Sequence, residues 1–179
     1  MIVPRFYEDL NVMHHKTMPA RTYYIPASVR MNDLVEHRER SDRFQLLNGE
    51  WKFQYYNSIY DVTESFYEKG YDVSGFDQVT VPGVWQMDGY DTHQYTNIRY
   101  PFPFDPPYVP QDIPCGAYVH NFEYYREKKA SKAFLNFEGV DSCFYVWVNG
   151  AYAGYSQVPH ATSEFDVTDL LNEGENTLA

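Results

Sequence analysis

Two carboxylates, Glu164 and Asp166, flank Phe165 in the stretch SEFDVT. Residues i and i+2 of a β-strand project from one face, about 6.5 to 7 Å apart along the chain. Retaining glycoside hydrolysis uses a carboxylate pair about 5 to 5.5 Å apart, and inverting hydrolysis uses a wider one. Catalytic carboxylates normally come from different elements across a cleft, so the structural interpretation is favoured. It places Phe165 in the core and both carboxylates solvated on an edge strand, with Asp166 or Thr168 capping the next turn.

Asn97 lies in a segment, residues 81–116, that holds seven of the eleven prolines and seven large aromatic residues. Proline fixes φ and lacks a backbone N–H, so this segment forms neither a helix nor a central strand. We predict a long, stiff, ordered loop, because its aromatic content disfavours disorder. Aromatic rings stack on saccharide C–H faces, and an amide such as Asn97 can hydrogen-bond saccharide hydroxyls. Alternatively, Asn97 holds a turn by bonding its own backbone, and the residues alone do not decide.

Metal and thiol chemistry has little support in the sequence. The six histidines, at positions 14, 15, 37, 93, 120 and 160, show no HExxH or HxH spacing. Cys115 and Cys143 lack CxxC spacing, and we expect packed free thiols. No serine lies in a GxSxG context. The sequence therefore predicts no catalytic residue and no metal site within this chain.

The 179 residues carry a formal net charge of −11, and 44% of them are hydrophobic. This length is enough for one soluble domain. The acidic balance disfavours nucleic acid and anionic membranes as partners, because both recruit basic patches. No apolar run approaches the ~20 residues of a membrane span, and Glu8 and Asp9 stand where a signal peptide has its apolar core. These features predict a cytoplasmic protein.

Apolar and polar residues alternate repeatedly from residue 44 onward, which predicts β-strands. The expected strands are 51–56, 78–81, 117–124, 133–137 and 143–148, the last followed by a hairpin turn of type I′ at Asn149-Gly150. Both faces of 143–148 are apolar, so both must be covered, either within a sandwich or by another domain. Several short antiparallel strands without a long helix predict an all-β fold, a β-sandwich of jelly-roll type.

Residues 1–43 show little periodicity and are predicted to form an extended leader before a domain at 44–179. A short helix is expected over Asn32–Arg40, with Asn32 as its cap and Leu34 and Val35 pointing inward. At the other end, Thr177 begins an apolar run that stops after three residues. We therefore expect the chain to be a fragment of a longer polypeptide, with the domain truncated at its C-terminal end.

Several ordered motifs together resemble a known family. They are LLNGEWKF (46–53), VPGVWQMDGYD (81–91), QYTNIRYPF (94–102), GAYVHNF (116–122), FEGVDSCFYVWVNGAYAGYSQ (137–157) and SEFDVT (163–168). They are similar to the N-terminal sugar-binding, jelly-roll domain of glycoside hydrolase family 2. The YTN and YP pattern with the proline-rich run resembles the β-galactosidases more closely than the β-glucuronidases or β-mannosidases. The chain departs from the family pattern at three loop positions, His93, Ile113 and His160.

The resemblance implies a parent enzyme that hydrolyses terminal β-D-galactosyl residues, such as that of lactose, with retention. In the family the two catalytic glutamates lie on a downstream TIM-barrel domain, so this chain alone is expected to be inactive. Mg²⁺ and Na⁺ are implied for the parent, which is expected to be a homo-oligomer with further β-sandwich domains. Asn97 matches the asparagine that contacts the galactosyl unit. The alternatives are a free carbohydrate-binding module, the N-terminal domain of another family 2 glycosidase (a β-glucuronidase or β-mannosidase), and a small hydrolase using Glu164 and Asp166.

Overall fold

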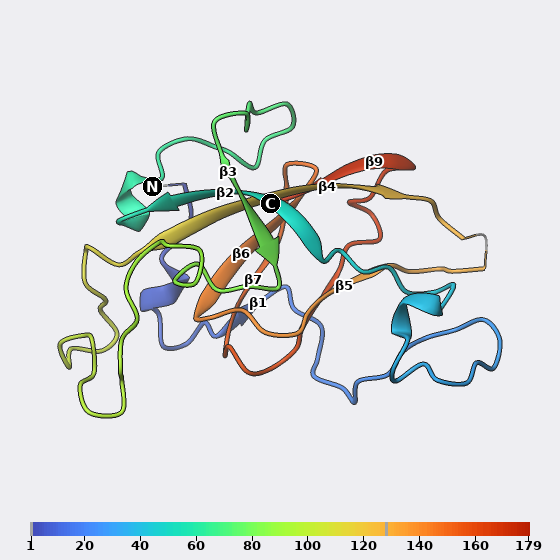
Figure 1. Ribbon diagram of the computed structural model, residues 1–179, viewed down its shortest axis with the longest axis horizontal. Helices are drawn as coiled ribbons and strands as arrows, with labels where there is room; N and C mark the ends of the chain where they lie inside the picture. Colours follow the sequence, from blue (N-terminus) through green and yellow to red (C-terminus); the bar gives the residue numbers. More distant parts are fainter. Residues whose placement is uncertain (1, 128) are drawn as a thin grey trace.

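The computed structural model describes residues 2–127 and 129–179, in which the regular secondary structure is almost wholly β-strand and long loops connect the strands (Figure 1). The strands are β1 (His14–His15), β2 (Gly49–Tyr56), β3 (Asp77–Val81), β4 (Cys115–Tyr124), β5 (Phe134–Phe137), β6 (Cys143–Val148), β7 (Ala151–Gln157), β8 (Ser163–Asp166) and β9 (Gly174–Leu178). Short 3-10 helices are η1 (Phe6–Glu8), η2 (Arg38–Arg40) and η3 (Ile59–Asp61). Within the described ranges, no helix has the length and apolarity needed to cross a bilayer.

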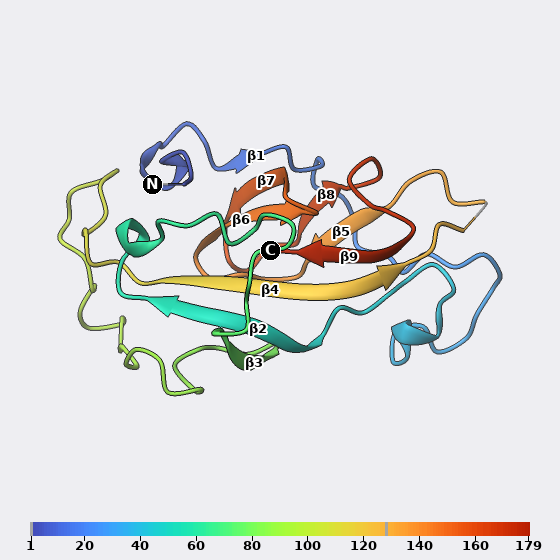
Figure 2. The ribbon, with the colours of Figure 1, turned by 90° about the horizontal axis from the view of Figure 1, so that it is seen from above.

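Seven strands form one antiparallel sheet in the order β1-β7-β6-β9-β4-β2-β3, and β5 and β8 pair separately. Strand β4 connects the two halves of the large sheet. Its residues 115–119 pair with β2, and its residues 120–124 pair with β9 on the other edge. Figure 2 shows β4 as the longest strand, running past the ends of its neighbours.

The core lies between the β5–β8 pair and the face of the large sheet formed by β2, β6 and β9. Alternation along β2 turns Trp51 and Phe53 inward, as the sequence predicts. Phe165 of β8 is fully buried, and the ring of Phe137 lies 4.8 Å from that of Phe144 on β6. The predicted all-β sandwich is confirmed.

The second face of β6 is also covered, and the cover comes from this chain. Trp147 stacks on Tyr67 with ring centroids 4.4 Å apart and planes within 4°. Tyr145 lies against Phe6, and its hydroxyl donates to the carbonyl of Pro4. Burial on both faces of this strand is therefore confirmed, with the leader and the segment after η3 supplying the outer layer.

The hairpin between β6 and β7 turns at Asn149 (φ 53°) and Gly150 (φ 82°). Two successive positive φ angles define the predicted type I′ turn. The side chain of Asn149 adds contacts that the turn alone does not require. Its Nδ2 donates to Asn176 Oδ1 at 2.7 Å, and its Oδ1 accepts from the backbone N–H of Thr177 at 2.9 Å. The turn residue thus fastens the hairpin to β9.

The leader differs from the prediction in one element. A helix over Asn32–Arg40 does not form, and only the 3-10 turn Arg38–Arg40 remains, with His37 rather than Asn32 preceding it. Asp33 has a φ of 63°, which interrupts a right-handed helical path. Val35 is 87% exposed rather than inward. A segment this short lacks the packing that would offset helix nucleation.

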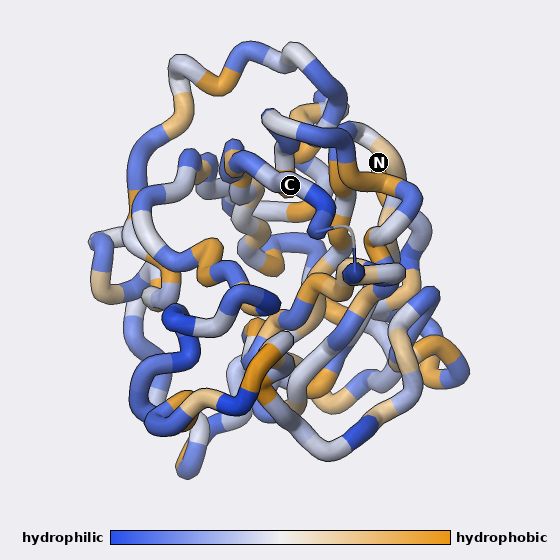
Figure 3. The backbone as a smooth tube through the Cα atoms, turned by 90° about the vertical axis from the view of Figure 1, so that its right-hand side faces the viewer, coloured by the Kyte–Doolittle hydropathy of each residue, from blue (hydrophilic) through white to orange (hydrophobic). Residues whose placement is uncertain are grey.

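Two long segments project from opposite ends of the strands. In Figures 1 and 2, residues 82–114 (green to yellow-green) project from one end, and residues 25–45 (blue to cyan) from the other. Figure 3 views the molecule from the end where residues 25–45 project, and the outlying loops are largely hydrophilic blue. The aromatic loop therefore stands apart from residues 25–45.

His120 on β4 gives the fold a predicted pH dependence. Its ring stacks on Trp51, with centroids 4.7 Å apart, and burial lowers the pKa of His120 below its ordinary value of 6.5. The folded chain therefore favours the neutral ring, so its contribution to stability is present above about pH 6.5 and is lost as the pH falls through the lowered folded pKa. Urea unfolding between about pH 5 and 8 should show this fall in the free energy of unfolding.

Substitution His120→Phe keeps an aromatic ring beside Trp51 and removes the titrating group, so it should flatten that pH dependence. The exposed loop residue His93 provides the matched control. A His93→Gln variant should keep the slope of the unmodified chain. An unchanged slope in His120→Phe would contradict the assignment.

Candidate functional site

Residues 82–114 contain no strand, so the predicted long loop between β3 and β4 is confirmed. Its first part is held by aromatic packing. The ring of Tyr90 lies 4.9 Å from that of Phe53, edge to face, and Trp85 lies 5.7 Å from Tyr55. Such pairs contribute about 0.5–1.5 kcal/mol each beyond their buried area. The loop therefore begins from a fixed base on β2.

Gly116 on β4 makes room for this base. A Cβ added at that position would lie 2.6 Å from the ring of Phe53 and 2.8 Å from that of Trp85, so only glycine fits. Close by, the hydroxyl of Tyr90 donates to Asp77 Oδ2 at 2.6 Å. This hydrogen bond to a carboxylate raises the pKa of Tyr90 to about 12. Tyr90 therefore stays protonated, as a donor, at neutral pH.

The second part of the loop is tied to other elements. The hydroxyl of Ser58 donates to the carbonyl of Gln111, and the backbone N–H of Val109 donates to Glu8 Oε1 at 3.4 Å. Glu8 belongs to η1, so the leader supports the loop as well. The loop is therefore held at its first part by the packing of Trp85 and Tyr90 and at its second part by the hydrogen bonds of Val109 and Gln111. Its tip lies between these two regions.

Asn97 lies at this tip, where residues 91–101 are all exposed. Its Nδ2 donates to the hydroxyl of Tyr95 at 3.3 Å. Residues 96–98 form a turn, so this contact is compatible with both the sugar-binding and the turn-holding interpretation of Asn97. The neighbouring rings of Tyr95 and Tyr100 are also exposed. An amide beside open aromatic faces suits a polar ligand with apolar patches.

Glu164 and Asp166 both make structural contacts, Glu164 an ion pair with Arg21 and Asp166 a turn cap. Phe165 is fully buried between them, as predicted. Asp166 Oδ1 accepts from the backbone N–H of Thr168 at 3.1 Å, which is the predicted cap. Hydrogen bonds from Lys132, and then from Thr168, lower the pKa of Asp166 below its ordinary value. The carboxylate is thus held ionised within a turn.

The prediction of a solvated Glu164 is wrong. Glu164 is 8% exposed and is paired with Arg21 of the leader, whose Nε donates to Oε1 at 3.0 Å. A second guanidinium nitrogen of Arg21 donates to Oε2. A buried carboxylate needs such a partner. Sequence reasoning missed Arg21 because it lies 143 residues away along the chain and carries no local motif.

The thiols and histidines show no site chemistry. Cys115 and Cys143 are free, as predicted, and burial raises the pKa of Cys115 to about 12. His14 Nδ1 lies 2.8 Å from Ser156 Oγ, and the ring of His15 stacks on Tyr152. Throughout residues 2–127 and 129–179, no group of three or more His, Cys, Asp and Glu side chains could hold a metal ion.

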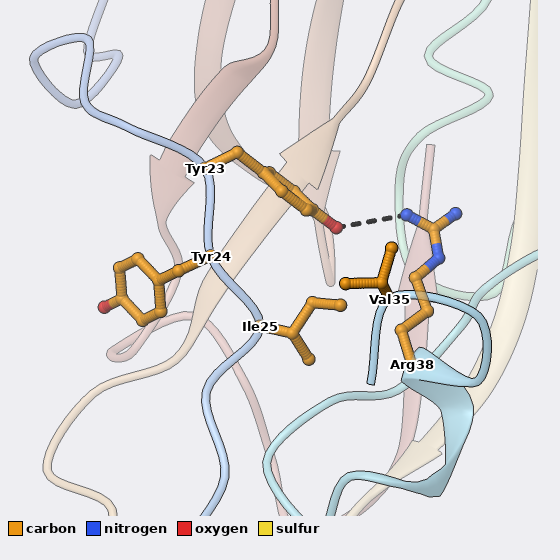
Figure 4. Close-up of a pocket in the computed structure, with 5 residues that line it drawn as sticks. All are labelled: Tyr23, Tyr24, Ile25, Val35 and Arg38. Atoms are coloured by element: carbon orange, nitrogen blue, oxygen red, sulfur yellow. Dashed lines mark hydrogen bonds between the residues drawn. The ribbon is translucent and has the colours of Figure 1, made fainter. Parts of the chain in front are cut away.

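A pocket lined by residues of the leader lies away from Asn97. Figure 4 shows Tyr23 directed toward Arg38, whose Nη1 donates to the tyrosine hydroxyl at 3.1 Å, with Val35 and Ile25 beside them and Tyr24 turned outward. Arg38 also pairs with Glu138. Residues 23–38 project from the opposite end to the aromatic loop (Figure 1). This pocket and Asn97 are therefore separate features.

The fold and the loop place this protein in the class of β-sandwich binding domains. Its aromatic loop carries Asn97 and is anchored to β2 by Trp85 and Tyr90. The chain belongs to the sugar binding domains of glycosyl hydrolases family 2, because residues 44–179 match the model of that family.

Curated relatives extend the similarity over nearly the whole chain. A β-galactosidase of Actinobacillus pleuropneumoniae is 45% identical over 178 residues, covering 99% of this chain and 17% of that relative. A β-galactosidase of Staphylococcus xylosus is 43% identical, covering 99% of this chain and 18% of the relative. Among solved structures, a β-glucuronidase of an uncultured Clostridium sp. is 25% identical, with a TM-score of 0.51, covering 75% of this chain and 21% of that one. The chain thus spans about a sixth of the curated relatives' length.

Proposed function

We propose that this chain is the sugar-binding domain of a β-galactosidase and forms part of the wall of that enzyme's substrate pocket. The single observation that carries this proposal is the 45% identity to a β-galactosidase along 99% of the chain. The likeness to a β-glucuronidase is weaker in sequence, at 25%. A galactoside with a terminal β-linked unit, such as lactose, is the proposed substrate of the whole enzyme.

The contribution of this chain to the proposed pocket is the tip of the loop at 82–114. Asn97 offers both an N–H donor and a carbonyl acceptor to sugar hydroxyls. Its side-chain nitrogen also donates a hydrogen bond to the hydroxyl of Tyr95. The fixed base at Trp85 and Tyr90 supports this role, because a held tip loses less conformational freedom on binding. Asn97 thus orients the galactosyl unit and takes no part in proton transfer.

The bond-breaking groups of the proposed enzyme lie outside this chain. In retaining hydrolysis one carboxylic acid protonates the leaving oxygen and a carboxylate attacks the sugar. Glu164 and Asp166 lie on the same strand, and each is occupied by an ion pair, Glu164 with Arg21 and Asp166 with Lys132. They therefore do not suit the roles of acid and nucleophile. Among the described residues, no group of three or more His, Cys, Asp and Glu side chains could hold a metal ion such as Mg²⁺. We propose that the remainder of a cytoplasmic, homo-oligomeric enzyme, including its barrel domain, supplies both.

Asn97→Ala in the full-length enzyme tests the proposal. Loss of one hydrogen-bonding amide should lower transition-state binding by about 1 to 3 kcal/mol. The measurement is kcat/KM for a chromogenic β-galactoside. Asn48→Ala is the matched control, because Asn48 is also exposed but lies before β2, outside the loop, and should leave kcat/KM unchanged. An unaltered kcat/KM in Asn97→Ala would remove Asn97 from the substrate site.

A further inference from the structure

The side chain of Asn97 has a polar partner on the same loop, the hydroxyl of Tyr95. Asn97 Nδ2 donates to that hydroxyl oxygen at 3.3 Å. The two residues flank Thr96, and residues 96–98 form the turn at the loop tip. In the part of the chain that the structure describes, neither side chain makes another hydrogen bond. Tyr95 and Asn97 therefore form a small polar unit on the exposed tip.

This contact limits the positions that the amide of Asn97 can adopt. The terminal torsion of an asparagine is broad, so an exposed amide without a partner samples many orientations. Here Nδ2 uses one of its two protons on Tyr95, and the second N–H and the carbonyl Oδ1 remain free for a ligand. An amide that is already held loses less rotational freedom when it binds. The hydroxyl of Tyr95 thus prepares Asn97 for binding.

The hydrogen bond matters more in a covered site than in the free chain. Tyr95 is 70% exposed, so water competes with this contact and its net contribution to folding is small. A sugar that covers the tip excludes that water, and hydrogen bonds in a site of lower dielectric are stronger. The effect of the hydroxyl should therefore appear in substrate binding and leave the stability of the fold unchanged.

The hydroxyl, rather than the ring, is the part of Tyr95 that makes a contact. Beyond the turn, the ring of Tyr100 packs edge to face against that of Phe102, with centroids 5.9 Å apart. The ring of Tyr95 has no such neighbour among the described residues, and its hydroxyl provides its one side-chain tie. A change of Tyr95 to phenylalanine therefore removes that tie and leaves the ring in place.

We propose that Tyr95 is a positioning residue for Asn97 in substrate binding. Its hydroxyl holds the amide at the loop tip, with one N–H and Oδ1 available to the hydroxyls of the sugar. Tyr95 acts through Asn97 and takes no part in breaking the glycosidic bond. This inference rests on the proposed function, because it assigns a task to Tyr95 within the same site.

A double-mutant cycle in the full-length enzyme tests the proposal. It compares the unmodified enzyme with Tyr95→Phe, Asn97→Ala and the double variant, and kcat/KM for a chromogenic β-galactoside is measured for each. Tyr95→Phe should lower kcat/KM about three- to tenfold, because the amide is no longer held. In the Asn97→Ala background the same change should have no further effect, since no amide remains to be positioned.

Two controls separate positioning from a structural role. Tyr108→Phe removes a hydroxyl from the same loop, and Tyr108 is 63% exposed, so it should leave kcat/KM unchanged. The melting temperature of Tyr95→Phe should equal that of the unmodified enzyme. A fall in kcat/KM that is accompanied by a lower melting temperature would overturn the proposal, because the hydroxyl would then stabilise the fold.

The cycle also distinguishes this inference from the proposed function. If Asn97→Ala lowers kcat/KM and Tyr95→Phe does not, the role of Tyr95 is overturned and that of Asn97 stands. Losses that multiply in the double variant would also overturn the inference, since Tyr95 would then act independently of Asn97. An unaltered kcat/KM in Asn97→Ala would remove both residues from the substrate site.

Discussion

Phe165→Ala is expected to lower the free energy of unfolding by about 3 to 5 kcal/mol, the range for large-to-small changes at fully buried aromatic positions. Phe165 is 0% exposed, and its ring packs edge to face against those of Phe137 and Phe144 at 6.0 and 6.1 Å. The backbone of Gly154 also lies against this ring, since a Cβ there would be 2.5 Å from it. A glycine has no side chain that can relax into the cavity.

Urea denaturation of the 179-residue chain measures this loss. Phe134→Ala is the matched control, because Phe134 lies on the paired strand β5 but is 41% exposed. It should lower the free energy of unfolding by less than about 1 kcal/mol, since little buried surface is lost. Equal losses in the two variants would show that Phe165 is not a central contact between the two sheets.

Arg21→Ala is expected to lower the free energy of unfolding by about 2 to 4 kcal/mol. The variant leaves the carboxylate of Glu164, which is 8% exposed, without its cation. It also removes a side-chain tie between the leader and β8. The expected loss is smaller than for a fully buried pair, because the side chain of Arg21 is itself 37% exposed and water screens part of the interaction.

Lys132→Ala is the matched control for Arg21→Ala, since Lys132 pairs with Asp166 on the same strand, β8, but is 57% exposed. It should change the free energy of unfolding much less than Arg21→Ala does, because solvent screens this exposed pair. In addition, Glu164→Gln should restore part of the stability lost in Arg21→Ala, because it removes the buried charge. A larger loss for Lys132→Ala than for Arg21→Ala would contradict this explanation.

Local alternation explains why most of the strands could be predicted from the sequence. Trp51 and Phe53 share one face of β2, and the apolar faces of β6 indicated correctly that both sides of this strand are covered. The turn at Asn149-Gly150 could be predicted because positive φ angles favour these two residue types. Period and turn chemistry act over a few residues, so a single sequence contains them.

Features that depend on distant partners could not be predicted in this way. Strand β1 consists of His14 and His15, which have no apolar alternation and become a strand only by pairing with β7. The burial of Glu164 depends on Arg21, and neither position reveals the other. The expected helix over Asn32–Arg40 failed for a related reason, since Val35 stays 87% exposed and contributes little buried surface to offset helix nucleation.

The loop that carries Asn97 was predicted from the sequence. Proline and aromatic content indicated a long loop over residues 81–116, and the segment without strands is slightly shorter, 82–114, because Val81 ends β3 and Cys115 begins β4. The residues alone did not decide between sugar binding and turn formation for Asn97. The family resemblance favoured sugar binding. The contacts of Trp85 and Tyr90 that hold the loop could not be predicted from the sequence either. They depend on the absence of a side chain at Gly116, where a Cβ would meet the rings of Phe53 and Trp85.

The pairing of β1 with β7 sets an order for folding during synthesis. His14 and Ser156 are partners in the sheet, and Arg21 finds Glu164 a little later in the chain. His14 therefore has no place to dock until the 142 residues after it have been synthesised. Until the leader docks, its tyrosine and methionine side chains are exposed to solvent. The nascent leader is thus a segment on which a chaperone or a protease can act before the fold closes.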